Sequence, residues 1–154
     1  MRKSRFIVAL LCLMIVSLCL PAIGKKTWDT IPLSQSQFSV WSGYYYNECM
    51  DRTIFLYQIC VKDDPALSHF VVELPQCCSL QIEFVSFPDF VEMGLDPTTG
   101  IDGIKWEVPV EAGYCMMFAF HLEGDWTDSI GRVEIGLKGG KVIALGEVWG
   151  PVCP

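Results

Sequence analysis

A serine and two histidines are the residues of this sequence best suited to acid–base or nucleophilic chemistry. Ser68 and His69 are adjacent, whereas His121 stands apart, four residues before Asp125. Neighbouring residues of a strand point to opposite faces, so we expect Ser68 and His69 not to share a proton directly. The sequence contains no Gly-x-Ser-x-Gly motif, no His-Glu-x-x-His motif and no phosphate-binding loop. It therefore predicts no catalytic residue and a protein that is not an enzyme.

One loop has the composition of a weak metal site. The segment Asp96 to Gly103 places two carboxylates, Asp96 and Asp102, on either side of hydroxyl-bearing residues that include Thr98. Calcium prefers oxygen ligands and takes about six to eight of them. The spacing does not match an EF-hand, because the third position offers only a hydroxyl and the closing glutamate is absent. Calcium held by Asp96, Thr98 and Asp102 is thus one hypothesis, and a structural turn is the other.

An aromatic cluster is the second candidate binding feature. Trp41, Tyr44, Tyr45 and Tyr46 lie close together in the sequence. If they belong to a strand, consecutive tyrosines face opposite ways, and we expect at least one of them to be exposed. Exposed aromatic rings are suited to stacking on sugars or to contacting a protein partner. The alternative is that these rings fill the core and the edge of the fold.

Cysteines provide the clearest indication of where the protein works. Six lie after residue 24, at Cys49, Cys60, Cys77, Cys78, Cys115 and Cys153. There is no Cys-x-x-Cys pair, so the spacing favours disulfides over a zinc site. A bond between adjacent cysteines is strained, so we expect Cys77 and Cys78 to bond to different parts of the fold. One of them is expected to bond to Cys153, and the remaining connectivity stays open.

Residues 1–24 have the layout of a secretory signal peptide. The segment has a basic start at Arg2, Lys3 and Arg5, an apolar run from Phe6 to Leu20, and small residues up to Gly24. A transmembrane anchor is the alternative, but it needs about 20 apolar residues, more than this run supplies. We therefore expect cleavage after Gly24, with no membrane span remaining, and a single domain over residues 25–154.

The charge of this domain excludes one class of partner. Three of the eleven basic residues lie in the leader and none of the eighteen acidic residues does, so residues 25–154 carry a formal charge of −10. Such a chain repels phosphate backbones, and no Lys/Arg cluster after Lys25-Lys26 reverses the charge locally. Nucleic acid is therefore not an expected partner.

The pattern after Thr27 is that of short strands. Apolar residues alternate with polar ones in runs that end at Gly, Pro or Asp. The predicted strands are Phe38–Val40, Tyr44–Tyr46, Thr53–Val61, Phe70–Leu74, Leu80–Phe87, Phe90–Met93, Ile104–Val108, Tyr114–Leu122, Arg132–Lys138 and Lys141–Trp149.

Several details of these strands are testable. Ser42-Gly43 is predicted to turn the first hairpin and Gly139-Gly140 the last. Leu80, Ile82 and Phe84 are expected on one face of their strand, and Tyr114–Leu122 is apolar enough to be a central strand covered on both faces. The fold class predicted is an antiparallel, disulfide-stapled β-sandwich of immunoglobulin-like character, with a closed barrel as the second choice.

Several segments taken in order resemble a known group of domains. They are PALSHFVVELP from Pro65 with Cys77 after it, GLDPTTGIDGIKW from Gly94, VEIGLKGG from Val133 and GEVWGPVC from Gly146. Together they resemble uncharacterised exported β-sandwich domains of bacterial secreted and surface proteins. The resemblance covers about Thr53 to Cys153. It implies a secreted or surface-associated domain and supplies no catalytic residue.

These observations predict a secreted or cell-surface protein with a structural or adhesive role, for which self-association is one option. The alternative is a soluble extracellular module that binds a carbohydrate or a protein partner through the aromatic residues Trp41 and Tyr44 to Tyr46. A secreted hydrolase is a third class, which would need several titratable groups converging in one pocket.

Overall fold

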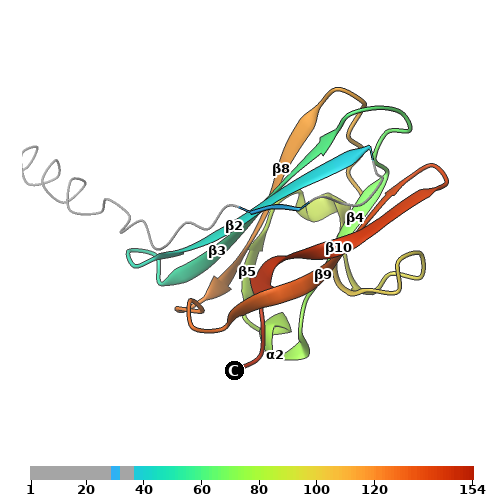
Figure 1. Ribbon diagram of the computed structural model, residues 1–154. Helices are drawn as coiled ribbons and strands as arrows, with labels where there is room; N and C mark the ends of the chain where they lie inside the picture. Colours follow the sequence, from blue (N-terminus) through green and yellow to red (C-terminus); the bar gives the residue numbers. More distant parts are fainter. Residues whose placement is uncertain (1–28, 32–36) are drawn as a thin grey trace, which may run out of the picture.

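Two antiparallel sheets pack face to face in the computed structural model, which describes residues 29–31 and 37–154 (Figure 1). The predicted signal peptide, residues 1–24, and its cleavage position lie outside the described residues. The first sheet has the order β1-β2-β3-β8-β5 and the second the order β10-β9-β4-β7-β6. The predicted antiparallel β-sandwich with disulfide staples is therefore confirmed.

The first sheet consists of β1 (Asp29–Ile31), β2 (Phe38–Asn47), β3 (Arg52–Val61), β8 (Cys115–Glu123) and β5 (Ile82–Val85). The second consists of β10 (Val142–Pro151), β9 (Ile130–Gly139), β4 (His69–Glu73), β7 (Asp102–Trp106) and β6 (Val91–Leu95). Two short helical turns, α2 (Gln76–Ser79) and the 3-10 turn η1 (Pro88–Phe90), connect β4 to β5 and β5 to β6. No helix among these described segments is long and apolar enough to cross a membrane.

Alternating residues of both sheets build the core. Phe70 of β4 stacks on Trp106 of β7, with ring centroids 4.7 Å apart, and both contact the edge of Phe118 from the opposite sheet. On the first sheet Phe55 stacks on Phe120 at 4.8 Å. Every one of these rings is fully buried, as the period-two pattern of the sequence predicts.

The first hairpin turns later than predicted. Ser42 and Gly43 are buried inside the continuous strand β2, and the chain reverses after Asn47 instead. Ser42 has a structural reason to lie in a strand: its hydroxyl accepts a hydrogen bond from the backbone N–H of Trp149 on β10, at 3.3 Å. The Tyr57 hydroxyl donates to the carbonyl of the same Trp149 at 3.1 Å. These two bonds join the sheets along the side formed by β2 and β10.

Two further details differ from the sequence prediction. Strand β8 lies between β3 and β5, but its outward residue Met117 is exposed, so only one of its faces is covered. In the last hairpin Gly139 is still paired with Val142, so the turn is Gly140-Lys141 and not Gly139-Gly140. The left-handed φ of +56° at Gly140 favours glycine there.

Strand β5 contains a bulge that changes which residues face the core. Ile82 pairs with the inward-facing Leu122, but Phe84 pairs with His121, whose ring it contacts on the outer face at 4.6 Å. The extra residue between them reverses the alternation. Ile82 and Phe84 therefore lie on opposite faces, contrary to the prediction that they share one with Leu80.

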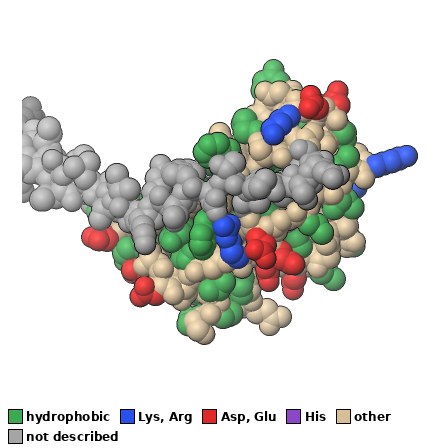
Figure 2. Space-filling view, viewed as in Figure 1, with side chains coloured by type: hydrophobic (Ala, Val, Ile, Leu, Met, Phe, Trp, Pro, Cys, Tyr) green, Lys and Arg blue, Asp and Glu red, His purple; other side chains and the backbone are tan. Residues whose placement is uncertain are grey.

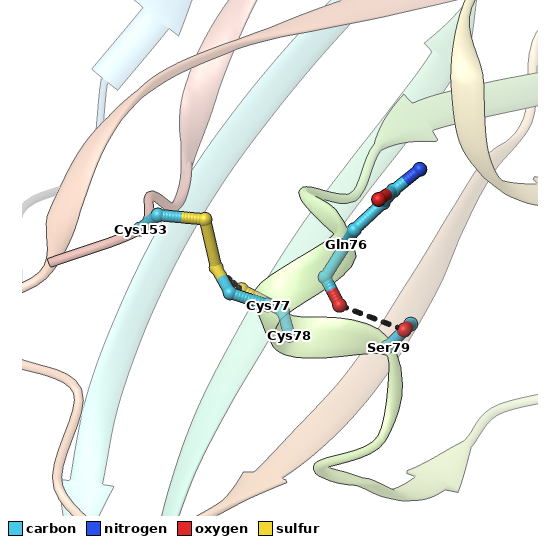
Figure 3. The surroundings of a disulfide bond; sticks show 5 residues. All are labelled: Gln76, Cys77, Cys78, Ser79 and Cys153. Carbon is cyan, nitrogen blue, oxygen red and sulfur yellow. Dashed lines mark hydrogen bonds between the residues drawn. A yellow bond between two sulfur atoms is a disulfide. The ribbon is translucent and has the colours of Figure 1, made fainter.

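The cysteines divide into bonded and free. Cys60 and Cys115, directly opposite each other on β3 and β8, form one disulfide. The turn α2 presents Cys77 to Cys153, which confirms the expected bond to the C-terminal segment (Figure 3). Cys49 is disulfide-bonded as well.

Cys78 does not take part in a disulfide, contrary to the prediction. It is a buried free thiol of the core, with its sulfur 3.6 Å from that of Cys77. Burial raises the pKa of this thiol to about 11. A buried, protonated thiol behaves as a small apolar side chain, which explains why Cys78 serves packing here.

Candidate binding site

The loop after β6 folds over the outer face of the second sheet. The Asp96 carboxylate accepts hydrogen bonds from the backbone N–H and the hydroxyl of Thr99, at 2.9 and 2.8 Å. The same carboxylate lies 3.7 Å from His69 Nε2 and 3.6 Å from Lys105 Nζ. Burial alone would raise the pKa of Asp96, but the two Thr99 donors and the charges of His69 and Lys105 hold it below its usual range.

The three residues of the calcium hypothesis are not brought together. Asp96 faces the outer side of the sheet, where it meets Lys105, whereas Asp102 lies three residues before Lys105 on β7 and so faces the other side. Thr98 is half-buried in the loop between them. Within residues 29–31 and 37–154, no group of three His, Cys, Asp or Glu side chains is placed to hold a metal ion. The geometry instead supports the alternative, a structural turn built on Asp96 and Thr99.

Ser68 and His69 are closer than strand alternation predicts. The Ser68 hydroxyl lies 3.5 Å from His69 Nδ1, and His69 Nε2 faces Asp96. Both separations are longer than an ordinary hydrogen bond, and the Ser68 hydroxyl donates to the Lys138 carbonyl at 2.9 Å. Ser68 is exposed on the surface. The Ser68 hydroxyl thus bonds to the backbone of β9 at the start of β4.

Acid is expected to destabilise this fold in two steps. Burial lowers the pKa of His69, and burial together with the charge of Arg52 lowers that of His121. A histidine with a lowered folded pKa binds its proton preferentially in the unfolded chain, so stability falls as the pH drops below about 6.5. Asp96, also with a lowered pKa, adds a second loss below about pH 4.

Urea unfolding followed by circular dichroism between pH 8 and pH 3 measures this dependence. The chain has two histidines, so the double variant His69→Gln with His121→Gln removes the whole upper step and leaves the lower one. An unchanged decline between pH 7 and pH 5 in that variant would contradict the assignment.

The aromatic residues singled out from the sequence are divided between two faces of β2. Tyr44 packs against the core beside Phe55, and the Tyr46 hydroxyl donates to the Asp51 carboxylate at 2.7 Å. All three tyrosines, Tyr44 to Tyr46, are half-buried, so the expectation of at least one exposed tyrosine is not met. Trp41 alone of the four is exposed, at 42%. The cluster therefore forms no continuous aromatic platform.

Exposed apolar side chains gather elsewhere, between residues 80 and 95. Of the twelve large hydrophobic side chains that are exposed in the described part of the chain, six lie in this short segment. They are Leu80, Phe84, Phe87, Phe90, Met93 and Leu95. The segment contains β5, η1 and β6, and each of these strands is the last of its sheet. Leu80 and Met93 come together at one hollow and form an exposed apolar surface there, whereas Phe84 lies on the outer face of the first sheet against His121.

A hollow of about 570 Å³ lies at one end of this segment, beside α2. We call it the β5–β6 hollow; its apolar lining comes from Leu74, Leu80, Ile82 and Met93. Asp102 is the charged residue among those that line it. At the other end of the segment the sheets are closed, because Trp106 Nε1 donates to the Ser86 carbonyl at 2.9 Å.

Sequence reasoning missed this surface although part of its signal was present. The predicted strand Phe90–Met93 overlaps β6 (Val91–Leu95), which lies at the edge of the second sheet. That β5 is the other edge depends on the strand order, which the sequence does not show.

Acidic side chains are dispersed over the face seen in Figure 2. Figure 2 shows Asp and Glu side chains in separate small groups, with hydrophobic side chains between them on the visible face.

Comparison of this chain with family models, with curated proteins and with solved structures finds no match.

Proposed function

We propose that this protein is an exported, non-catalytic binding domain with a structural or adhesive role at or outside the cell surface. The observation that carries the proposal is the apolar segment of residues 80–95, which places two edge strands side by side in the chain with their large side chains exposed. The disulfides fit an oxidising compartment, where such bonds persist. The predicted leader fits the same location.

The chemistry of the hollow supports binding over catalysis. An acid–base mechanism needs at least two titratable groups converging on one site. Asp102 alone of the lining residues is titratable in its side chain, beside Gln76, Ser79 and apolar residues. A lone exposed carboxylate suits the recognition of a partner.

Retention on cells tests the proposal. Purified secreted protein is incubated with intact cells of the producing strain and the bound fraction is measured after washing. We expect the double variant Leu80→Ser with Phe90→Ser to lower retention roughly tenfold, because two exposed apolar contacts are lost.

The matched control is Ile143→Ser with Leu145→Ser, on the edge strand β10, where both side chains are exposed to a similar degree as Phe90. It should retain wild-type binding. Equal retention of both double variants, or a protein that stays inside the producing cells, would overturn the proposal.

A glycan is the second candidate ligand. Trp41 is exposed on the outer face of the first sheet, directly opposite the amide side chain of Gln58. An aromatic face next to an amide is suited to stacking on a sugar and bonding its hydroxyls. Loss of retention in Trp41→Ala, with normal retention of Leu80→Ser and Phe90→Ser, would favour this ligand over a protein.

A further inference from the structure

The two long sides of the sandwich differ. On one side the sheets are joined by the hydrogen bonds of Ser42 and Tyr57 to Trp149. On the other side β5 faces β6, and β5 has only four residues and a bulge. The short strand leaves β6 without full cover from the opposite sheet.

Side chains that face inward on β6 are consequently exposed. In the register with β7, Met93 pairs with Ile104 and Val91 with Trp106, so these β6 residues lie on the core side of the sheet. Val91 packs against the core. Met93, in contrast, is 53% exposed, and Leu95 on the same face is 68% exposed. Inward-facing side chains of a β-sandwich are normally buried between the two sheets. This end of β6 can therefore accommodate further apolar side chains packed against it.

The backbone of β6 is available along the same edge. Glu107 N–H donates to the Phe90 carbonyl and Asp96 N–H to the Ile101 carbonyl, which makes the even-numbered residues of β6 those that bond to β7. The N–H and C=O groups of Val91, Met93 and Leu95 therefore point outward. Among the described residues no strand pairs with them.

The edge strand β6 has no side chain at Gly94, next to the hollow. Gly94 pairs with Gly103, and both line the β5–β6 hollow. A Cβ placed on Gly94 would meet no atom within 4 Å, so the space beside it is open. The positive φ of +123° favours glycine at position 94, and the Val72 carbonyl of β4 leaves no room for a Cβ at Gly103.

The negative charge around β6 favours a positively charged binding partner. On the outer face three carboxylates, Glu92, Asp96 and Glu107, share the single ammonium of Lys105, at 3.2, 3.6 and 2.6 Å. Glu92 is the one on β6 itself, and its side chain is 64% exposed. The site therefore has an excess of negative charge, which attracts a cation and repels a second copy of this acidic chain.

From this geometry, and resting on the proposed binding function, we propose that β6 accepts an added strand from a partner. The occupant is an extended peptide segment in which apolar residues alternate with lysine or arginine. Its backbone pairs with the outward groups of Val91, Met93 and Leu95, its apolar side chains cover the β5–β6 hollow, and its cations lie beside Glu92. Main-chain pairing supplies affinity in such complexes, and the side-chain positions supply specificity.

Synthetic peptides test this inference on the secreted protein. The probe is a fluorescein-labelled ten-residue peptide of alternating valine and lysine, and fluorescence anisotropy measures its binding. We expect the corresponding valine–glutamate peptide to bind at least tenfold more weakly. Glu92→Gln should weaken the lysine peptide several-fold and leave a valine–threonine peptide unchanged.

Backbone methylation separates strand pairing from simple charge attraction. N-methylation of one alternate set of peptide amides should abolish binding, whereas methylation of the other set should preserve it, because only one edge of an added strand donates to β6. Met93→Ser should weaken binding about tenfold and the control Ile143→Ser should not.

Equal binding of the two methylated peptides would overturn the inference, as would equal binding of the lysine and glutamate peptides. So would dimerisation of the free protein in sedimentation experiments, if Met93→Ser abolished it. Retention on cells without peptide binding would contradict this inference alone, and peptide binding without retention would contradict the proposed cellular role alone.

Discussion

Trp106→Ala is expected to lower the free energy of unfolding by about 3–5 kcal/mol, the range for deleting a large aromatic side chain from a core. Trp106 is fully buried at the centre of the sandwich, stacked on Phe70 and in contact with Phe118 of the opposite sheet. The surrounding strands are tied by their ladders and cannot collapse into the space left. Urea unfolding followed by far-UV circular dichroism measures the change without depending on tryptophan emission.

Two variants separate the contributions of this residue. Trp106→Phe keeps a ring in the core but leaves the Ser86 carbonyl without its donor, at a cost of about 1–3 kcal/mol. Trp41→Ala removes an indole that is 42% exposed and should cost about 1–2 kcal/mol. Equal losses in Trp106→Ala and Trp41→Ala would contradict the placement of Trp106 in the core.

The strands of this sandwich could be predicted because their signal is local. The predicted run Thr53–Val61 differs from β3 by one residue. Its alternation and its β-branched residues lie within the segment, and the residues that end the strand, Asp63-Asp64-Pro65, follow almost directly. The hairpin predicted at Ser42-Gly43 failed for a non-local reason. Turn-forming residues are tolerated inside β2 because the backbone N–H of Trp149, more than a hundred residues away, donates a hydrogen bond to the Ser42 hydroxyl.

Features that depend on which face a residue occupies were harder to predict. Asp96 and Asp102 are six apart in a loop, but the hairpin sends their carboxylates to opposite sides of a sheet. Likewise, one bulged residue in β5 reverses the faces of Ile82 and Phe84. Alternation assigns faces only when the pairing register is known and unbroken, and the bulge in β5 has no signature in the residues themselves.

The candidate site combines both kinds of information. Hydrophobic residues at Leu80, Phe84, Phe90 and Met93 are visible in the sequence, where they belong to the predicted strands Leu80–Phe87 and Phe90–Met93. They become exposed because α2 and η1 carry the chain between the sheets and place β5 and β6 at their edges. The order of strands in a sheet depends on pairing between distant residues. The site could therefore not be inferred from the local sequence and required the three-dimensional structure.

Removing the disulfide between α2 and the C-terminal segment is the second large effect that we expect. Cys77→Ser with Cys153→Ser opens a loop of 76 residues and should lower the free energy of unfolding by about 4 kcal/mol, if the bond acts by restricting the unfolded chain. The double variant avoids leaving either partner as a free thiol. The measurement is urea unfolding under non-reducing conditions.

The second disulfide decides whether that mechanism holds. Cys60 and Cys115 close a loop of 55 residues, and the logarithmic dependence on loop length predicts that removing this bond costs only about 0.3 kcal/mol less than removing the other. The two bonds differ in their folded surroundings, because Cys60 and Cys115 join strands already paired in one sheet, whereas Cys77 and Cys153 hold α2 beside the β5–β6 hollow. Nearly equal losses would therefore show that both bonds act on the unfolded chain. A much larger loss for Cys77 and Cys153, together with weaker binding of the valine–lysine peptide, would show instead that this bond maintains the folded shape of the hollow.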